Sequence, residues 1–127
     1  MKEGLIYPEL SYRLIGVAYA IFNEIGYGYK EKLYQRAFRI ELAKNSIQFQ
    51  EEKRVRLVYK GEIIGYYQYD FLVEDKIVVE LKVRHRFGYV DIHQVLGYLK
   101  ARHLELALLI YFTKEGVKFR PIINPRK

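Results

Sequence analysis

The sequence predicts an α/β (α+β) fold in which helices flank one mixed β-sheet, with the elements in the order α-α-β-β-β-α-β-β. Apolar residues recur at helical spacing in the first third of the chain, and alternation with a period of two follows. One later helix, over residues 90–102, then lies between strand-like segments. Because helices and sheets each bury an apolar face, this order predicts layers packed around a shared core.

The first helix is expected over residues 10–25, where apolar side chains recur at helical spacing and Ser11 is a candidate N-cap. It should end at Gly26, the first residue of the segment Gly26-Tyr27-Gly28. A glycine-rich phosphate loop follows a strand, and no strand precedes these glycines. We therefore interpret Gly26 as a helix C-cap.

The second helix is expected over residues 30–44, and Asn45 is a natural stop signal. The face that we expect to turn toward the core is formed by Leu33, Ala37 and Ile40, with Ala43 or Lys44 continuing it.

Strand patterning begins at Arg54, where Val55, Leu57 and Tyr59 alternate with Arg54, Arg56, Val58 and Lys60. Lys60-Gly61-Glu62 is a hairpin signal, so residues 63–73 are expected to form the return strand. Residues 77–83 are expected to form a further strand.

A basic loop over residues 84–88 leads into the third helix at 90–102. The continuous apolar run at 106–112 is typical of a buried strand, and residues 117–123 are expected to form the last strand. The side chains of the third helix that we expect to face the core are Ile92, Val95, Leu96 and Leu99.

The 127 residues show no repeat and no linker, which indicates one domain over residues 1–127. There are 22 Lys and Arg residues against 15 Asp and Glu residues, a formal charge of +7. A basic surface favours a polyanionic partner such as nucleic acid, although many basic proteins only carry a solvated positive surface.

The composition also excludes several kinds of site. The absence of Cys excludes disulfides, thiolate zinc sites, iron–sulfur clusters and a cysteine nucleophile. With only three His residues, a bound metal is expected to be a hard cation held by oxygen ligands. The apolar runs are shorter than the ~20 residues that span a bilayer, so no membrane partner is expected. The first residues lack an export signal, and we expect a cytoplasmic protein.

Asp70 and Glu80 are the residues that most strongly suggest chemistry. Glu80 and Lys82 project from one strand face because the side-chain period is two. A two-residue loop at Asp75-Lys76 would mix charges into apolar positions. A three-residue loop pairs Asp70 with Glu80, and it separates an apolar face from a charged one. The three-residue register is the one we expect, with Phe71 opposite Val79 and Val73 opposite Ile77.

Two facing carboxylates repel each other unless a cation or a proton lies between them. Such a pair, with Lys82 beside it, is therefore a candidate metal site. The alternative is a purely structural one, a half-exposed strand with a Glu–Lys contact. On the third helix, Asp91, Gln94 and Tyr98 form a polar stripe, as they would on an ordinary solvated helix face.

These motifs, taken in order, resemble the PD-(D/E)XK nuclease superfamily. Asp70 is followed by Glu80-Leu81-Lys82 and then by Gln94 and Tyr98, similar to the Q-x-x-x-Y helix of RecB-like members. Residues 28–34 are similar to the signature of the small GxxExxY proteins of that superfamily. Tyr69 occupies the place of the signature proline, and Tyr111 stands where Asn is expected.

The resemblance implies a restriction-endonuclease-like fold and a nuclease that uses Mg²⁺ or Mn²⁺ to hydrolyse phosphodiester bonds, in DNA rather than RNA. Asp70, Glu80 and the Leu81 carbonyl would hold the metal, with Glu31 as a further ligand unless it is only a solvated helix charge. Lys82 would orient or deprotonate the attacking water.

Further residues are implied in positioning and binding. Gln94 and Tyr98 would position Lys82 or the phosphate. The candidates for contacts with backbone phosphates are Arg84, His85, Arg86 and Lys100. A homodimer is expected because cutting both strands needs two sites. The alternatives are a non-catalytic nucleic-acid-binding module on the same fold and a protein-interaction scaffold.

Overall fold

A computed structural model describes residues 6–51, 54–86 and 88–125 of the chain. It contains three helices and seven strands within these ranges, and the α+β class is as predicted. The elements are α1 (Pro8–Ile25), α2 (Glu31–Lys44), β1 (Phe49–Glu51), β2 (Arg54–Tyr59), β3 (Glu62–Gln68), β4 (Phe71–Val73), β5 (Ile77–Val83), α3 (Tyr89–Arg102), β6 (Leu106–Thr113) and β7 (Gly116–Ile123).

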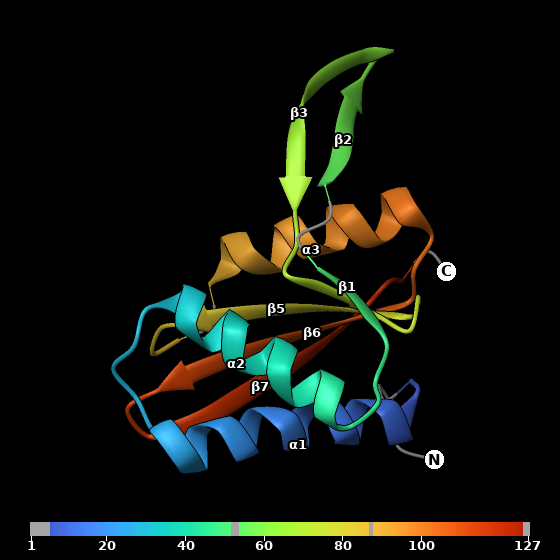
Figure 1. Cartoon of the computed structure of the whole chain (residues 1–127). Helices are drawn as coiled ribbons and strands as arrows, with labels where there is room; N and C mark the ends of the chain where they lie inside the picture. The colour runs from blue at the N-terminus through green and yellow to red at the C-terminus, as the bar shows by residue number, and fades with distance from the viewer. Residues whose placement is uncertain (1–5, 52–53, 87, 126–127) are drawn as a thin grey trace.

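Five strands form a mixed sheet in the order β1-β4-β5-β6-β7, and β2 and β3 form a separate hairpin (Figure 1). The central pair β5–β6 is parallel, and the other neighbouring pairs of the sheet are antiparallel. Every residue of β6 is buried. A strand covered on both faces has no polar side to alternate, which explains the unbroken apolar run in its sequence.

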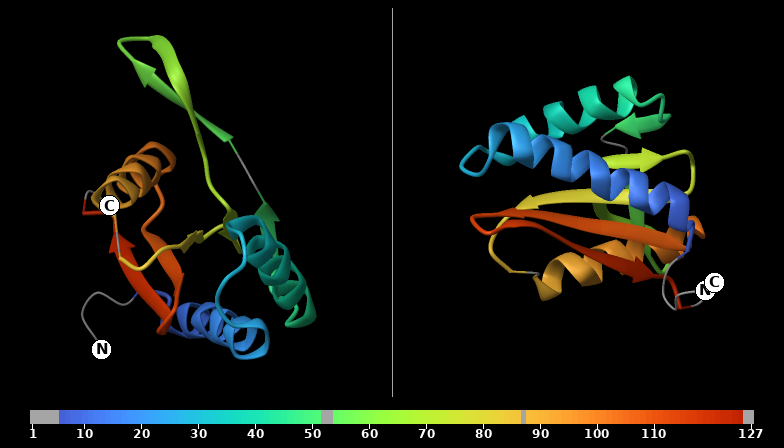
Figure 2. Two further views of the ribbon diagram at one scale, coloured as in Figure 1. Left: turned by 90° about the vertical axis from the view of Figure 1, so that its left-hand side faces the viewer. Right: turned by 90° about the horizontal axis from the view of Figure 1, so that it is seen from below.

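Helices cover both faces of the sheet: α1 and α2 lie on one face and α3 on the other (Figure 2). Along β5, Val79 and Leu81 contribute to the core beneath α1 and α2, whereas Val78 contributes to the core beneath α3. Glu80 and Lys82 follow Val78 in the same alternation and therefore lie on the α3 face.

The inner face of α2 differs from the prediction. Tyr34, Phe38 and Leu42 are fully buried, whereas Leu33 and Ile40 are 42% and 53% exposed. The buried residues recur every four positions, and two of them are aromatic. The prediction followed the aliphatic residues, but the larger rings fill the space above the sheet, where Phe38 packs against Phe71.

The helix ends agree with the prediction better than the helix starts. The N–H of Gly26 donates to the Phe22 carbonyl at 2.8 Å, so this glycine is the C-cap that we predicted, with a φ of 73°. Ser11, in contrast, is not the N-cap of α1, because the helix already begins at Pro8. The Ser11 hydroxyl donates instead to the Ile6 carbonyl at 3.2 Å.

The predicted return strand over residues 63–73 is wrong, because it is two strands. β3 pairs only with β2, whereas β4 pairs with β1 and β5 in the main sheet. Tyr69 and Asp70 lie at the break. The local alternation of apolar and polar residues continues across this break. The break could therefore not be located without knowing the strand partners. The three-residue strand β1 was not predicted, since it is too short to show a period.

The register of the β4–β5 hairpin is confirmed. Phe71 pairs with Val79 and Val73 pairs with Ile77, across the three-residue connection 74–76. Within the described ranges, no helix has the length and apolar character needed to cross a membrane.

Tyr34 joins three parts of the fold. Its ring stacks on Phe112 of β6 with 4.2 Å between centroids, and its hydroxyl donates to the Gly26 carbonyl at 2.5 Å. It therefore connects α2 to the end of α1 and to the centre of the sheet. Gly28, in the connection between these helices, has a φ of 120°, a conformation that side-chain-bearing residues rarely adopt.

Two replacements of Tyr34 should separate the stabilisation by its hydroxyl from the stabilisation by its ring. Tyr34→Phe removes only the hydroxyl donor and should lower the free energy of unfolding by about 1 kcal/mol. Tyr34→Ala also leaves a cavity and should cost about 3–5 kcal/mol. Urea unfolding monitored by circular dichroism measures both values. Tyr12→Phe is the control, because Tyr12 is 72% exposed and its replacement should change little. Equal effects of Tyr34→Phe and Tyr12→Phe would contradict this role.

Candidate active site

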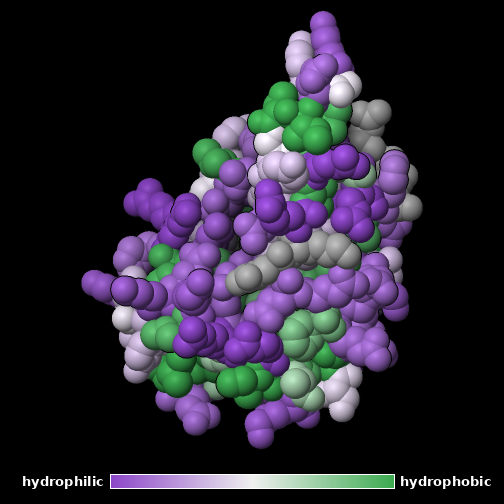
Figure 3. Space-filling model, turned by 45° about the horizontal axis from the view of Figure 1, so that its top comes forward, coloured by the Kyte–Doolittle hydropathy of each residue, from purple (hydrophilic) through white to green (hydrophobic). Residues whose placement is uncertain are grey.

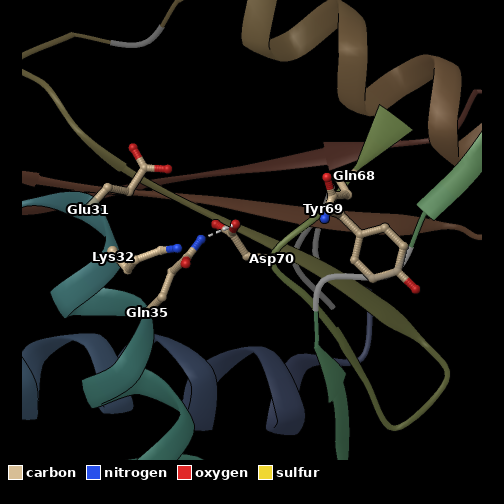
Figure 4. Close-up of a pocket in the computed structure, with 6 residues that line it drawn as sticks. All are labelled: Glu31, Lys32, Gln35, Gln68, Tyr69 and Asp70. Atoms are coloured by element: carbon tan, nitrogen blue, oxygen red, sulfur yellow. Dashed lines mark hydrogen bonds between the residues drawn. The ribbon is translucent and has the colours of Figure 1, made fainter. Parts of the chain in front are cut away.

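A pocket lies between the first turns of α2 and the break between β3 and β4 (Figure 4). Lys32 and Gln35 extend from α2 toward Asp70 in this pocket (Figure 4). The residues that line it are Glu31, Lys32, Gln35, Gln68, Tyr69 and Asp70.

Asp70 is 9% exposed and both of its carboxylate oxygens accept hydrogen bonds. The main-chain N–H of Leu81 donates to Oδ2 at 2.7 Å, and the Gln35 side-chain amide donates to Oδ1. Burial raises the pKa of Asp70 to about 6, against the Leu81 hydrogen bond, which lowers it. The negative charge of Glu31, which lines the same pocket, raises this pKa further.

Glu80 is 5% exposed and accepts a hydrogen bond from the Tyr67 hydroxyl on β3. Burial raises the pKa of Glu80 to about 8, and the charge of Asp70 raises it as well. Asp70 and Glu80 therefore form a buried carboxylate pair whose charges repel. Burial and the charge of Glu80 also raise the pKa of Tyr67, so its hydroxyl remains a donor.

Lys82 lies beside this pair, and its positive charge lowers the pKa of both Asp70 and Glu80. Its ammonium group is 4.0 Å from a carboxylate oxygen of Asp91, which is 5% exposed at the start of α3. A buried carboxylate at the start of α3 thus holds the lysine beside Asp70 and Glu80.

Asp91 organises a further set of contacts around Lys82. Its Oδ2 atom is 3.2 Å from the guanidinium of Arg84 and accepts a hydrogen bond of 2.6 Å from the Tyr111 hydroxyl. The Gly88 N–H donates to the same hydroxyl at 3.2 Å. Burial and the hydrogen bond to Asp91 raise the pKa of Tyr111 to about 12, so the phenol stays protonated. Tyr111 therefore has a defined structural role at the position where the resemblance led us to expect Asn.

Gln94 and Tyr98, the two further site candidates on α3, differ in their surroundings. Gln94 is exposed one turn beyond Asp91. Tyr98 is 1% exposed, and its ring packs against the rings of Tyr67 and Tyr69 with centroid separations of 5.7 and 4.7 Å. Its contact with Tyr67 connects it to Glu80 through one side chain.

The basic candidates do not all lie together. Arg84, His85 and Arg86 are exposed after β5, next to the cluster, and the His85 ring is 5.9 Å from that of Tyr27. Lys100 is exposed near the opposite end of α3 from Asp91. It is therefore separated from Asp91 by most of the helix.

Sequence reasoning did not assign Gln35, Tyr67 and Asp91 to the site. Gln35 follows Glu31 by one helical turn, so its place on the same helix face was available from spacing. Asp91 stood out as part of the polar stripe, but nothing in the sequence connected it to Lys82. Tyr67 gave no signal, because its reach to Glu80 depends on the path of the hairpin.

Asp70 and Glu80 together provide the oxygen donors that Mg²⁺ and Mn²⁺ prefer. Within residues 6–51, 54–86 and 88–125, no three His, Asp or Glu side chains gather into a metal-binding group. A cation at this pair would therefore depend on two carboxylates, main-chain carbonyl oxygen and water. That set suits Mg²⁺, which usually keeps several waters. The repulsion within the pair gives a cation a clear electrostatic role, so the residues present fit such an ion.

Comparisons with known proteins identify the fold family. A solved structure titled SSO0001 superposes with a TM-score of 0.58 at 19% identity. The aligned region covers 94% of this chain and 58% of that chain. An alkaline exonuclease (LHK-Exo) from Laribacter hongkongensis gives a TM-score of 0.56 at 9% identity, over 97% of this chain and 74% of that one. No curated protein sequence matches the chain. At these identities the two structures show a shared fold alone.

A family model adds sequence evidence to this likeness in fold. The model described as the PD-(D/E)XK nuclease superfamily matches residues 8–121. Members of this superfamily generally use divalent metal ions and act on nucleic acid. The match covers every motif on which the resemblance was based, from residue 28 to Tyr98. The chain belongs to the PD-(D/E)XK nuclease superfamily.

Proposed function

We propose that this protein is a Mg²⁺- or Mn²⁺-dependent nuclease that hydrolyses phosphodiester bonds in DNA. The observation that carries the proposal is the buried pair Asp70 and Glu80 with Lys82 beside it. A domain that only binds nucleic acid gains nothing from buried acidic residues that repel phosphate. The same pair is useful to an enzyme, because it concentrates negative charge where a metal ion is needed.

Asp70, Glu80 and the Leu81 carbonyl are the proposed metal ligands, and Glu31 across the pocket is a further candidate. The ion would act as a Lewis acid toward the phosphate and activate a water molecule. The protein's own contribution is to hold the ligands still. The Gln35 amide and the Leu81 N–H fix Asp70, and the Tyr67 hydroxyl fixes Glu80.

Lys82 is proposed to orient the attacking water and to offset the negative charge that develops on the phosphate. Asp91 helps to hold the lysine in this place, because its Oδ1 atom is 4.0 Å from Lys82 Nζ. Because Asp91 also contacts Arg84, it can set the position of two cations relative to one phosphate. Gln94 and Tyr98 are proposed as positioning residues, Tyr98 through its packing against Tyr67.

The exposed basic residues are proposed to contact the DNA backbone without reading its sequence. Arg84, His85 and Arg86 lie next to the site, whereas Lys100 would reach a phosphate farther along the substrate. We further propose that the protein acts as a cytoplasmic homodimer, in which two sites cut the two strands.

A cleavage assay tests the proposal as a whole. Linear, circular, branched and single-stranded DNA and RNA should be incubated with Mg²⁺, with Mn²⁺ or with EDTA. We expect cleavage of DNA that depends on the metal. Binding of DNA without cleavage under every condition would replace the enzyme with a non-catalytic binding module, and absence of binding would favour a protein-interaction scaffold.

Neutralising either carboxylate should abolish cleavage without unfolding the protein. Asp70→Asn and Glu80→Gln remove repelling charge, and rotation of the Gln35 amide can preserve its hydrogen bond to residue 70. The metal-free variants should therefore be at least as stable as the wild type, while the stabilisation by Mg²⁺ or Mn²⁺ is lost. Calorimetry of Mn²⁺ binding and thermal unfolding measure these effects. Variants that keep both metal binding and cleavage would contradict the assignment.

Lys82→Ala should separate metal binding from chemistry. The variant should still bind Mn²⁺ by calorimetry, because both carboxylates remain, but it should cleave DNA at least about 100-fold more slowly. Lys114→Ala is the control, since Lys114 is an exposed lysine in the turn between β6 and β7. Loss of Mn²⁺ binding in Lys82→Ala would show that the lysine only supports the site structurally.

The metal-free protein should become less stable as the pH rises from about 4 to about 8. The folded pKa values of Asp70 and Glu80 are raised to about 6 and about 8, so the folded state binds more protons than the unfolded state in this window. The stabilisation of the folded state by these protons is complete below pH 4 and is lost above pH 8. The double variant Asp70→Asn with Glu80→Gln should show a flatter dependence in urea unfolding with EDTA. Parallel curves for the two proteins would contradict the raised pKa values.

A further inference from the structure

The β2–β3 hairpin projects from the body of the protein, and its two faces differ in their surroundings (Figure 1). Strand partners share a face, so the pairs Arg54–Gln68 and Arg56–Tyr66 place four side chains on one side. The pair Val55–Tyr67 lies on the other side. We call the surface formed by Arg54, Arg56, Tyr66 and Gln68 the arm face.

The side opposite the arm face is occupied by the protein itself. Val55 is 8% exposed and packs with Tyr67 into the core beneath α3. The Tyr67 hydroxyl also donates to Glu80. These contacts anchor the base of the hairpin and leave the arm face directed away from α3.

The arm face continues directly into the candidate active site. Gln68, its last residue, lines the pocket together with Asp70 (Figure 4). Tyr66 precedes Asp70 by four residues, which span roughly 14 Å at most in extended chain. A polymer bound at the carboxylate pair and extending toward the hairpin would therefore meet the arm face within a few monomer units.

The chemistry of the arm face suits a nucleic-acid strand. The guanidinium of Arg54 lies over the Tyr66 ring, 4.1 Å from its centroid, and Tyr66 as a residue is 54% exposed. Arg56 adds a second exposed cation beside this ring. Guanidinium groups bind phosphates, and an exposed aromatic ring can stack on an unpaired base. In a duplex the base faces are already covered by their neighbours, so the ring favours a single strand.

A second copy of the protein is the competing occupant of the hairpin. The tip carries exposed aliphatic side chains, among them Val58, Ile63 and Ile64, and a hydrophobic patch is visible near the projecting arm (Figure 3). The arm face itself contains two cations and no acidic residue. This charge is complementary to nucleic acid rather than to another copy of a chain with a formal charge of +7.

We propose that the arm face binds the single-stranded part of the nucleic acid next to the phosphate held at the active site. This inference rests on the proposed nuclease function, and it adds that substrates with an unpaired flank are bound more tightly than blunt duplexes.

The test is fluorescence anisotropy of the 127-residue chain with Ca²⁺ in place of Mg²⁺, using a labelled single-stranded oligodeoxynucleotide and its blunt duplex. Tyr66→Ala should weaken single-strand binding about 5- to 100-fold, as expected for the loss of base stacking. Tyr66→Phe keeps the ring and should stay within about twofold of the wild type. Arg56→Gln should reduce the salt dependence of binding by about one phosphate contact.

Lys44→Gln is the matched control, because Lys44 is exposed at the opposite end of α2 from the pocket and its replacement also removes one positive charge. It should bind the single strand as the wild type does. If Tyr66→Ala and Arg56→Gln also bind like the wild type, the inference is wrong. The inference is equally wrong if the wild type binds the duplex as tightly as the single strand. It is also wrong if the variants keep wild-type binding and change only the oligomeric mass measured by light scattering.

The two proposals can fail separately. A wild type that binds single strands through Tyr66 but cuts nothing with Mg²⁺ or Mn²⁺ would overturn the nuclease function and support the arm face. A wild type that cuts DNA, with arm-face variants that bind and cut equally well, would support the nuclease and overturn the arm face.

Discussion

The hydrogen bond from the Leu81 N–H to the Asp70 carboxylate is the contact on which the site depends. It forms just beyond the last β4–β5 pair, where an antiparallel ladder would otherwise continue with main-chain partners. A side-chain carboxylate takes the place of the missing strand partner. The main chain is thereby free to turn away into the hairpin, and a negative charge is placed beside Glu80 at the edge of the buried sheet.

This arrangement divides the sheet into two faces with different tasks. The face beneath α1 and α2 is apolar and holds Tyr34 and Phe38 against the central strands. The face beneath α3 carries Glu80 and Lys82 among apolar neighbours, where ionised groups are costly unless they have partners. Tyr67 is the partner of Glu80 and Asp91 is the partner of Lys82, so each charged group of β5 is held by a residue from another element.

Adjacent residues of β3 connect the hairpin to the site in opposite directions. Tyr67 reaches inward to Glu80, whereas Tyr66 lies on the exposed arm face beside Arg54. A nucleic-acid strand that held Tyr66 in place would therefore also hold Tyr67 in place, because the two residues are adjacent in the backbone of β3. This geometry connects the exposed arm face to the orientation of a carboxylate inside the protein. Tyr98 is linked to the same carboxylate through its packing against Tyr67.

The amino-acid sequence was enough to predict the order of most helices and strands, the register between Phe71 and Val79, and the grouping of Asp70 with Glu80 and Lys82. These features depend on local periodicity and on a short loop, which neighbouring residues specify. Three features could be seen only in the folded chain: the buried face of α2, the break in the return strand, and the contacts of Gln35, Tyr67 and Asp91 with the charged residues. Each of these depends on contacts between elements that are distant in sequence, and a periodic pattern contains no information about the partner that it will meet.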